Sequence, residues 1–140
     1  HCELRVTAHG PRLIEIAGRL PGGPLQLGYR QTYGYNLPQN LIDIWTGKTT
    51  TLEKTREMHV IQKAIYDYTE GTLTKLNGIE NLSSLSGVWA FSQITQLNER
   101  IKTYPKVPDP IYFYAAEAET EEKLNQLERA VEKTVTYSIT

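Results

Sequence analysis

Apolar and polar side chains alternate from the second residue of the chain, with Cys2, Leu4 and Val6 on one side. A period of two predicts a half-buried β-strand over residues 2–7. Residues 8–11 (Ala-His-Gly-Pro) have the composition of a turn, and residues 13–17 predict a second strand. We therefore expect a hairpin whose apolar side, Cys2 included, packs in a core.

The later pattern predicts both helices and strands. Helical spacing predicts a short helix over 25–35, a helix over 37–45 capped by Asn36, and a helix that begins at the capping residue Thr120. A helical turn is expected over 80–85. Runs rich in β-branched and aromatic residues predict strands over the ranges 58–68 (with a helix as the competing interpretation), 72–76, 88–97, 111–116 and 134–139. The order predicts an α+β protein with mostly antiparallel sheet and a few helices.

Composition narrows the class of protein. The chain has 140 residues, a net charge of −1, one cysteine and no apolar run long enough for a membrane span. Near-neutrality argues against a generally basic nucleic-acid binder, and a single cysteine excludes an internal disulfide framework. We expect a cytoplasmic protein that binds neither nucleic acid nor membrane.

Because a strand pattern starts at once and without an initiator Met, we also expect a piece of a longer polypeptide. The polar stretch 48–56 is the best internal linker candidate, so we expect two parts, residues 1–47 and 48–140.

The hairpin holds the candidate chemistry. If residue 7 faces 11 and residue 5 faces 13, then Glu3 faces Glu15, and like charges so placed need a shared proton, a cationic side chain or a divalent metal. Mg²⁺ suits the pair because it binds one or two carboxylates together with substrate phosphates. A solvated surface pair is the commoner meaning of such spacing. Arg19 follows in a loop of small residues, with Gly22 and Gly23, and its planar guanidinium suits a phosphate or carboxylate.

Residues 1–23, HCELRVTAHGPRLIEIAGRLPGG, resemble the final hairpin and glycine loop of the ATP-grasp superfamily. Members show H-x-E-x-R, a turn, and then x-x-I-E-x-N-x-R followed by glycines. The segments TLTKLNGIENL and IYFYAAEAETEEKLNQLERAVEKTV are similar in pattern to the C-terminal lid region of the biotin-carboxylase-like branch and of related amino-acid ligases. The resemblance implies the C-terminal part of an ATP-grasp fold, with residues 1–47 ending the catalytic subdomain and 48–140 forming a lid-like subdomain.

The resemblance also implies roles for the hairpin residues. Glu3 and Glu15 match the two acidic ligands that hold Mg²⁺, with Mn²⁺ as an alternative, against the ATP phosphates. Arg19 matches the catalytic arginine that contacts the γ-phosphate, the acyl phosphate or the acceptor, and Gly22 and Gly23 would lie against substrate. The usual asparagine is replaced by Ala17, which argues against a biotin carboxylase and leaves a degenerate site open.

The resulting expectation is the C-terminal portion of an ATP-dependent carboxylate–amine ligase that forms a C–N bond through an acyl phosphate, in amino-acid or dipeptide ligation. A bicarbonate-activating ATP-grasp enzyme and a non-catalytic binding module are the alternatives. The expected partners are the upstream part of the same polypeptide and small carboxylate and amine substrates, with a homodimer left open. The 140 residues alone should not turn over ATP, since phosphate positioning needs both halves of the enzyme.

Overall fold

The computed structural model describes residues 1–102 and 106–140. The chain divides into two compact units, His1–Arg56 and Glu57–Thr140, which are described here one at a time. The polar stretch 48–56 therefore lies with the first unit, whereas the sequence pattern placed the boundary before that stretch, at residue 47. No helix in the described part of the chain is long and apolar enough to cross a membrane.

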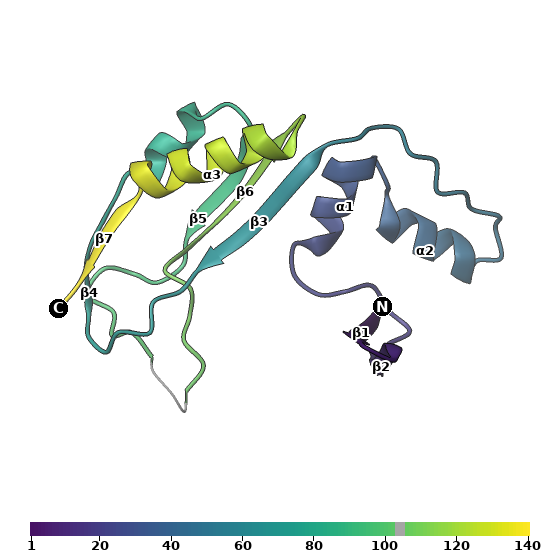
Figure 1. The fold of residues 1–140 in the computed structure, drawn as a ribbon, viewed down its shortest axis with the longest axis horizontal. Helices are drawn as coiled ribbons and strands as arrows, with labels where there is room; N and C mark the ends of the chain where they lie inside the picture. Colours follow the sequence, from purple (N-terminus) through teal and green to yellow (C-terminus); the bar gives the residue numbers. More distant parts are fainter. Residues whose placement is uncertain (103–105) are drawn as a thin grey trace. The chain divides into compact units, whose positions relative to one another are not determined.

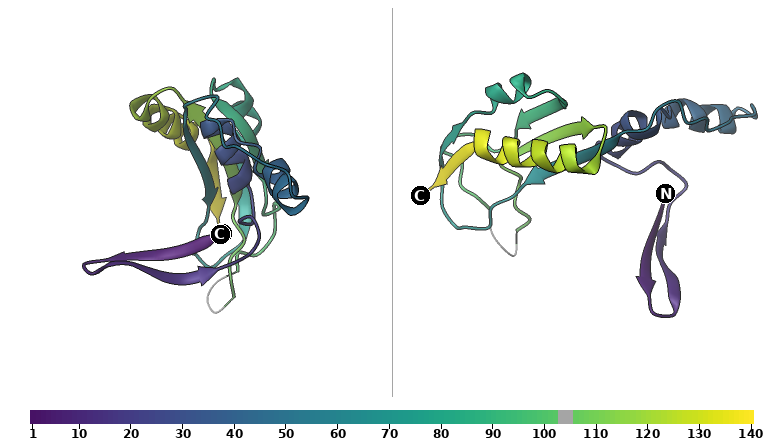
Figure 2. Two further views of the ribbon diagram at one scale, coloured as in Figure 1. Left: turned by 90° about the vertical axis from the view of Figure 1, so that its right-hand side faces the viewer. Right: turned by 45° about the horizontal axis from the view of Figure 1, so that its top comes forward.

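The first unit contains the predicted hairpin and two helices. Strands β1 (Cys2–Thr7) and β2 (Gly10–Ile16) pair antiparallel in a two-stranded sheet (Figure 2). Helices α1 (Leu25–Tyr33) and α2 (Leu37–Trp45) follow (Figure 1). Asn36 caps α2 as predicted, its Oδ1 accepting a hydrogen bond from the Gln39 N–H at 3.4 Å. Pro38 lies in the first turn of α2. Its missing N–H removes no helical hydrogen bond, because the N–H groups of a first turn have no partner within the helix.

The end of the polar stretch is fastened to the C-terminal end of α1. The Thr55 N–H donates to the Tyr33 carbonyl at 3.0 Å, and Arg56 Nη1 donates to Gln31 Oε1 at 2.6 Å. Gly34 ends α1 with φ +83°, and a Cβ at this position would lie 1.9 Å from Thr55 Oγ1. Only glycine fits there, because both the left-handed backbone and the close approach exclude a side chain.

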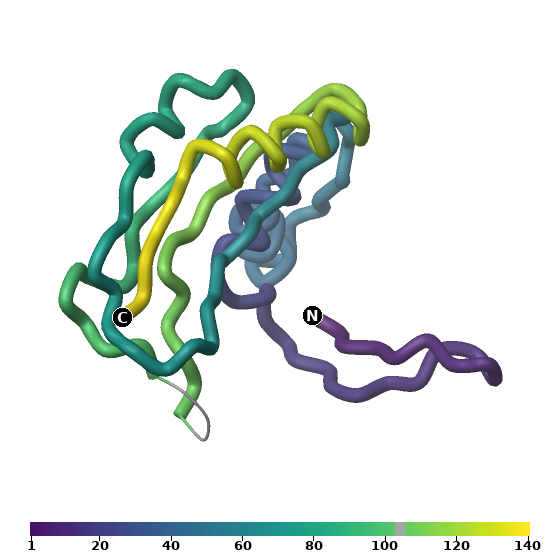
Figure 3. The backbone as a smooth tube through the Cα atoms, turned by 60° about the vertical axis from the view of Figure 1, so that its left-hand side comes forward, coloured from purple at the N-terminus to yellow at the C-terminus, as the bar shows by residue number. Residues whose placement is uncertain are grey.

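The second unit is a helix-covered antiparallel sheet. Its sheet has the order β3 (His59–Ile65), β6 (Tyr112–Ala118), β5 (Val88–Gln93), and α3 (Glu121–Thr134) packs on one face (Figure 1). After α3 the chain enters β7 (Thr136–Ile139), which pairs with β4 (Leu73–Asn77), as Figure 3 shows. A short 3₁₀ helix, η1 (Glu80–Ser84), precedes β5. The α+β class with antiparallel sheet is confirmed.

Several strand ends differ from the sequence pattern, and two of them are explained by the way in which the strands pair. The strand expected over 88–97 ends at Gln93, because the N–H groups of Ile94 and Thr95 both donate to the Ile111 carbonyl and the chain turns away there. The strand expected over 111–116 runs on to Ala118. Both differences depend on a partner strand that is distant in sequence, which a local pattern does not record.

The hydrophobic core belongs to the second unit. Its buried apolar residues come from β4, η1, β6, α3 and the segments next to them: Leu73, Leu82, Ile101, Ile111, Tyr112, Tyr114, Ala115, Ala116, Val131 and Val135. The predicted stripe of α3 is confirmed, since Val131 is fully buried while Leu124 and Leu127 pack against the core. Thr120 caps α3 by accepting from the Lys123 N–H at 3.2 Å.

The first unit, by contrast, buries no apolar side chain fully. Neither α1 nor α2 contains a buried residue. Leu4, Val6 and Ile16 of the hairpin are 56%, 85% and 69% exposed. The expectation that Cys2 packs in a core is therefore wrong, because Cys2 is exposed on the uncovered apolar side of the hairpin.

Candidate functional site

The hairpin turn is tighter than the sequence suggested. Thr7 pairs with Gly10, so that only Ala8 and His9 form the loop, and Gly10 has φ +92°. The Thr7 hydroxyl closes this turn by donating to the Gly10 carbonyl at 2.8 Å and accepting from the His9 N–H at 3.1 Å. The expected pairings of residue 7 with 11 and of residue 5 with 13 are wrong by one residue, and Arg5 faces Arg12 instead.

A β-bulge nevertheless places the two candidate metal ligands opposite each other. Leu4 pairs with Leu13, but the next pair is Glu3 with Glu15, so Ile14 is the extra residue on β2. If the two strands paired without a bulge, Glu3 would face Ile14, and the Glu15 side chain would project from the other side of the hairpin. The expected opposition of Glu3 and Glu15 is thus present, although it is produced by a tighter turn and a compensating bulge.

Glu3 and Glu15 form an exposed acceptor pair. Cross-strand partners have Cβ atoms about 4.5–5.5 Å apart, and like charges at that separation repel. The Glu3 side chain is 52% exposed, and its Oε1 lies 3.8 Å from His1 Nε2. No group of three or more His, Cys, Asp or Glu side chains that could hold a metal occurs among the described residues. Two carboxylates alone fit Mg²⁺, which takes its other ligands from water and phosphate.

Arg19 lies immediately beyond the open end of the hairpin. The strands remain paired as far as Ala17, whose N–H donates to the His1 carbonyl at 2.8 Å. Arg19 is exposed, and its Nη1 donates to the carbonyl of the next residue, Leu20, at 3.0 Å. Such a contact with neighbouring backbone leaves the other guanidinium N–H groups available to an anion.

The glycine loop leads from Arg19 into α1. At Gly22 and Gly23 an added Cβ would meet no atom within 4 Å, and Gly23 has φ +66°. The backbone is therefore open to close approach by a ligand at both positions. Glu3, Glu15, Arg19 and this loop all lie at the open end of the hairpin, which is the grouping that the sequence pattern predicted.

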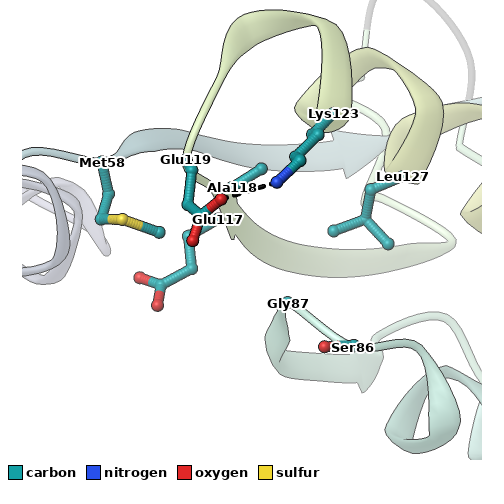
Figure 4. A pocket seen from close by; sticks show the side chains of 8 residues that line it. All are labelled: Met58, Ser86, Gly87, Glu117, Ala118, Glu119, Lys123 and Leu127. Atoms are coloured by element: carbon teal, nitrogen blue, oxygen red, sulfur yellow. Dashed lines mark hydrogen bonds and ion pairs between the residues drawn. The ribbon is translucent and has the colours of Figure 1, made fainter.

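A hollow of about 410 Å³ lies in the second unit where β6 meets α3 (Figure 4). Lys123 Nζ and Glu119 Oε2 form an ion pair at its α3 side at 2.6 Å, and Gly87 passes so close to the Glu117 carbonyl that a Cβ would lie 2.5 Å away. The hollow contains none of the site residues that the sequence indicated. Its lining residues are Met58, Ser86, Gly87, Glu117, Ala118, Glu119, Lys123 and Leu127.

The other charged cluster of the second unit joins the sheet to α3. Lys63 of β3 donates to Glu128 and, at 3.3 Å, to Glu132, and these hydrogen bonds raise the pKa of Lys63. Burial raises the pKa of the nearby Tyr114 to about 12. Both groups therefore keep one protonation state at neutral pH, which suits a structural link better than proton transfer.

Arg5 and Arg12 form a pair that the sequence interpretation missed. They lie directly opposite each other, next to the Glu pair on the turn side. The signal was present in the turn composition: a two-residue loop at Ala8 and His9 brings Arg5 against Arg12, whereas the assumed pairing of residue 7 with residue 11, which leaves a three-residue loop, does not.

Comparison with known proteins gives structural matches only. No family model matches the sequence, and no curated protein matches it. Among solved structures, an L-amino acid ligase from Bacillus licheniformis superposes with a TM-score of 0.77 at 18% identity, over 100% of this chain and 36% of that one. A phosphoribosylglycinamide synthetase from Anaerococcus prevotii superposes with a TM-score of 0.72 at 14% identity, over 99% of this chain and 36% of that one.

Both of these proteins are ATP-grasp enzymes, and the chain spans about a third of the length of each. At identities below 20% the likeness concerns the fold. The chain has the fold of the C-terminal part of an ATP-grasp enzyme.

Proposed function

We propose that this chain is the C-terminal portion of an ATP-dependent carboxylate–amine ligase. The observation that carries the proposal is the opposition of Glu3 and Glu15 on a hairpin that ends in Arg19 and a glycine loop. Two carboxylates and a guanidinium at one end of a hairpin suit a metal-bound phosphate better than they suit a folding role. The shared fold with an L-amino acid ligase supports amino acids as substrates.

The proposed reaction has two steps. A carboxylate oxygen attacks the γ-phosphorus of ATP, which releases ADP and leaves an acyl phosphate. An amine nitrogen then attacks the carbonyl carbon, phosphate leaves with the oxygen that bridged it, and the nitrogen loses a proton. Glu3 and Glu15 would hold Mg²⁺, which neutralises charge on the transferring phosphoryl group when bound. Arg19 would bind the transferred phosphoryl group and orient it.

Ala17 bears on which branch of this chemistry is favoured. It supplies no side-chain oxygen two residues after Glu15, so Glu3 and Glu15 would be the hairpin's whole contribution to the metal shell. Mg²⁺ tolerates this composition because it retains water readily. The loss of one ligand would make the metal site more dependent on both carboxylates than in a site with an added amide oxygen.

ADP formation tests the proposal. The full polypeptide encoded by the gene is incubated with ATP, Mg²⁺ and a mixture of amino acids, and ADP is measured. We expect ADP formation that requires amino acids and is lost in the Glu3→Gln, Glu15→Gln double variant, and none from residues 1–140 alone. ADP formation that needs bicarbonate instead would indicate a carboxylase-type enzyme, and none under any condition would favour a binding module.

A further inference from the structure

The arginine pair lies on the same face of the hairpin as the candidate metal ligands. Glu3 and Arg5 are two residues apart on β1, so their side chains project to one side. Glu15 and Arg12 are their cross-strand partners and project to that side with them. One face of the hairpin thus presents an acidic pair followed, toward the turn, by a basic pair.

These four charges do not neutralise one another. In a strand pair, a Glu and an Arg on neighbouring rows of one face are within reach of an ion pair. Yet neither the Arg5 nor the Arg12 side chain forms an ion pair or hydrogen bond with any residue that the structure describes, and both residues are exposed. Two guanidinium groups held directly opposite each other repel unless an anion lies between them.

The order of charges along the hairpin gives the ligand a direction. Arg19 lies beyond the open end, the acidic pair comes next, and the arginine pair lies one row, about 7 Å, nearer the turn. If Arg19 binds the transferred phosphoryl group and a cation lies at Glu3 and Glu15, the remaining phosphate of an extended triphosphate falls over Arg5 and Arg12. Two guanidinium groups suit a phosphate because they carry the opposite charge and can donate paired hydrogen bonds to its oxygens.

We infer that Arg5 and Arg12 form an anion subsite for the α-phosphate, so that the nucleotide lies along the hairpin with its nucleoside toward the turn. This inference rests on the proposed function, since it takes the positions of the γ-phosphate and the metal from that proposal. It adds a role for two residues that the metal and the transfer step do not use. Arg5 and Arg12 are binding residues in this arrangement, and Arg19 alone faces the reacting atoms.

The test compares nucleotides that differ only in their phosphates. Affinities of the full polypeptide for ATP, ADP, AMP and adenosine are measured by displacement of a ribose-labelled fluorescent ATP analogue. In the Arg5→Gln, Arg12→Gln double variant we expect ATP, ADP and AMP each to bind about tenfold more weakly per arginine lost, because each retains the α-phosphate. Adenosine should bind unchanged.

Three further variants test the direction of the nucleotide, the effect of charge alone and the need for a guanidinium. The Glu3→Gln, Glu15→Gln double variant should weaken ATP and ADP but leave AMP nearly unchanged, because AMP lacks the phosphates nearest the metal. Arg129→Gln, which removes an exposed arginine from α3, is the charge control and should leave all four affinities unchanged. Arg5→Lys with Arg12→Lys should recover part of the lost affinity, since charge remains while the planar contact does not.

The outcome shows whether the proposed function or only the anion subsite is wrong. If the wild-type protein binds no ATP, the proposed function falls and this inference falls with it. If it binds ATP and the arginine variant retains wild-type affinities, the inference alone is overturned. It is also overturned if the arginine variant loses kcat while AMP affinity stays normal, because the pair would then face the transferred phosphoryl group.

Discussion

At the scale of single residues, charge decides how the hairpin is interpreted. The segment has no buried side chain to stabilise it, yet it carries two pairs of like charges and one further arginine: Glu3 with Glu15, Arg5 with Arg12, and Arg19. An isolated two-stranded hairpin is marginally stable in water, and opposed like charges lower that stability further. Such an arrangement is costly for folding and useful for binding ions of opposite sign.

Arg19 should matter for the chemical step. Arg19→Ala should lower kcat about 10²-fold or more while it changes ATP affinity little, by analogy with the loss of one preorganised donor. The reason is that its guanidinium meets charge that develops on the transferring phosphoryl group. Arg19→Lys should restore little, because an ammonium makes no bidentate contact. Steady-state kinetics of the full polypeptide measure both effects, and near-normal kcat in Arg19→Ala would reduce Arg19 to a surface residue.

The glutamates should instead set the requirement for metal. Glu3→Gln and Glu15→Gln each remove a charged oxygen ligand while they preserve side-chain volume. We expect the Mg²⁺ concentration for half-maximal activity to rise roughly tenfold in each single variant, the equivalent of about 1.4 kcal/mol. Glu53→Gln, at an exposed acid in the polar stretch, is the control and should leave the requirement unchanged. An unchanged requirement in both Glu3→Gln and Glu15→Gln would remove the metal site from the account.

At the scale of elements, the bulge on β2 positions Glu15. Deleting Ile14 should leave Leu13 opposite Leu4 and bring Glu15 directly after it, still opposite Glu3. Inserting one alanine between Ile14 and Glu15 should move Glu15 out of register with Glu3. The Mg²⁺ requirement should therefore change little in the deletion and rise steeply in the insertion. Equal effects in the two variants would show that the register of this hairpin does not set the metal site.

The contact between α3 and the loop after β4 tests the packing of the second unit. Gly78 has φ +86°, and a Cβ there would lie 2.0 Å from the Thr134 carbonyl oxygen. Gly78→Ala should lower the free energy of unfolding by more than the roughly 1–2 kcal/mol expected for the left-handed backbone alone. Asn98→Ala, at φ +68°, is the control for that backbone cost. Denaturation followed by Trp89 fluorescence in a Trp45→Phe background measures the difference, and equal losses would contradict the close approach.

At the scale of the whole molecule, the elements that local signals define were predictable. The α3 helix has its cap, its acidic first turn and its apolar stripe within fourteen residues, and its beginning follows from them. The end of β5 and the exposure of Cys2 were not predictable, because each depends on residues distant in sequence or on what covers a surface. The turn register was misassigned although its signal lies within the turn itself. The Glu3–Glu15 pairing was predicted through an incorrect register that the bulge corrects.

The two units also differ in what they can do alone. The second unit contains the buried core, whereas the first contains the candidate site and exposes its apolar side chains. A site on such a unit is expected to need further polypeptide for a fixed geometry, since precise positioning of reacting groups depends on packing around them. This is the physical reason why the proposed ligase chemistry should be measured in the full polypeptide.

The most direct test of the central claim follows the oxygen of the carboxylate. Amino acids labelled with ¹⁸O in both carboxylate oxygens are incubated with the full polypeptide, ATP and Mg²⁺, and the released inorganic phosphate is analysed by mass spectrometry. Attack of the carboxylate on the γ-phosphorus places one ¹⁸O in the phosphate, and the amine then breaks the bond from carbon to that oxygen. We predict one ¹⁸O in each released phosphate. Phosphate that carries only oxygen from ATP and water would contradict an acyl-phosphate ligase.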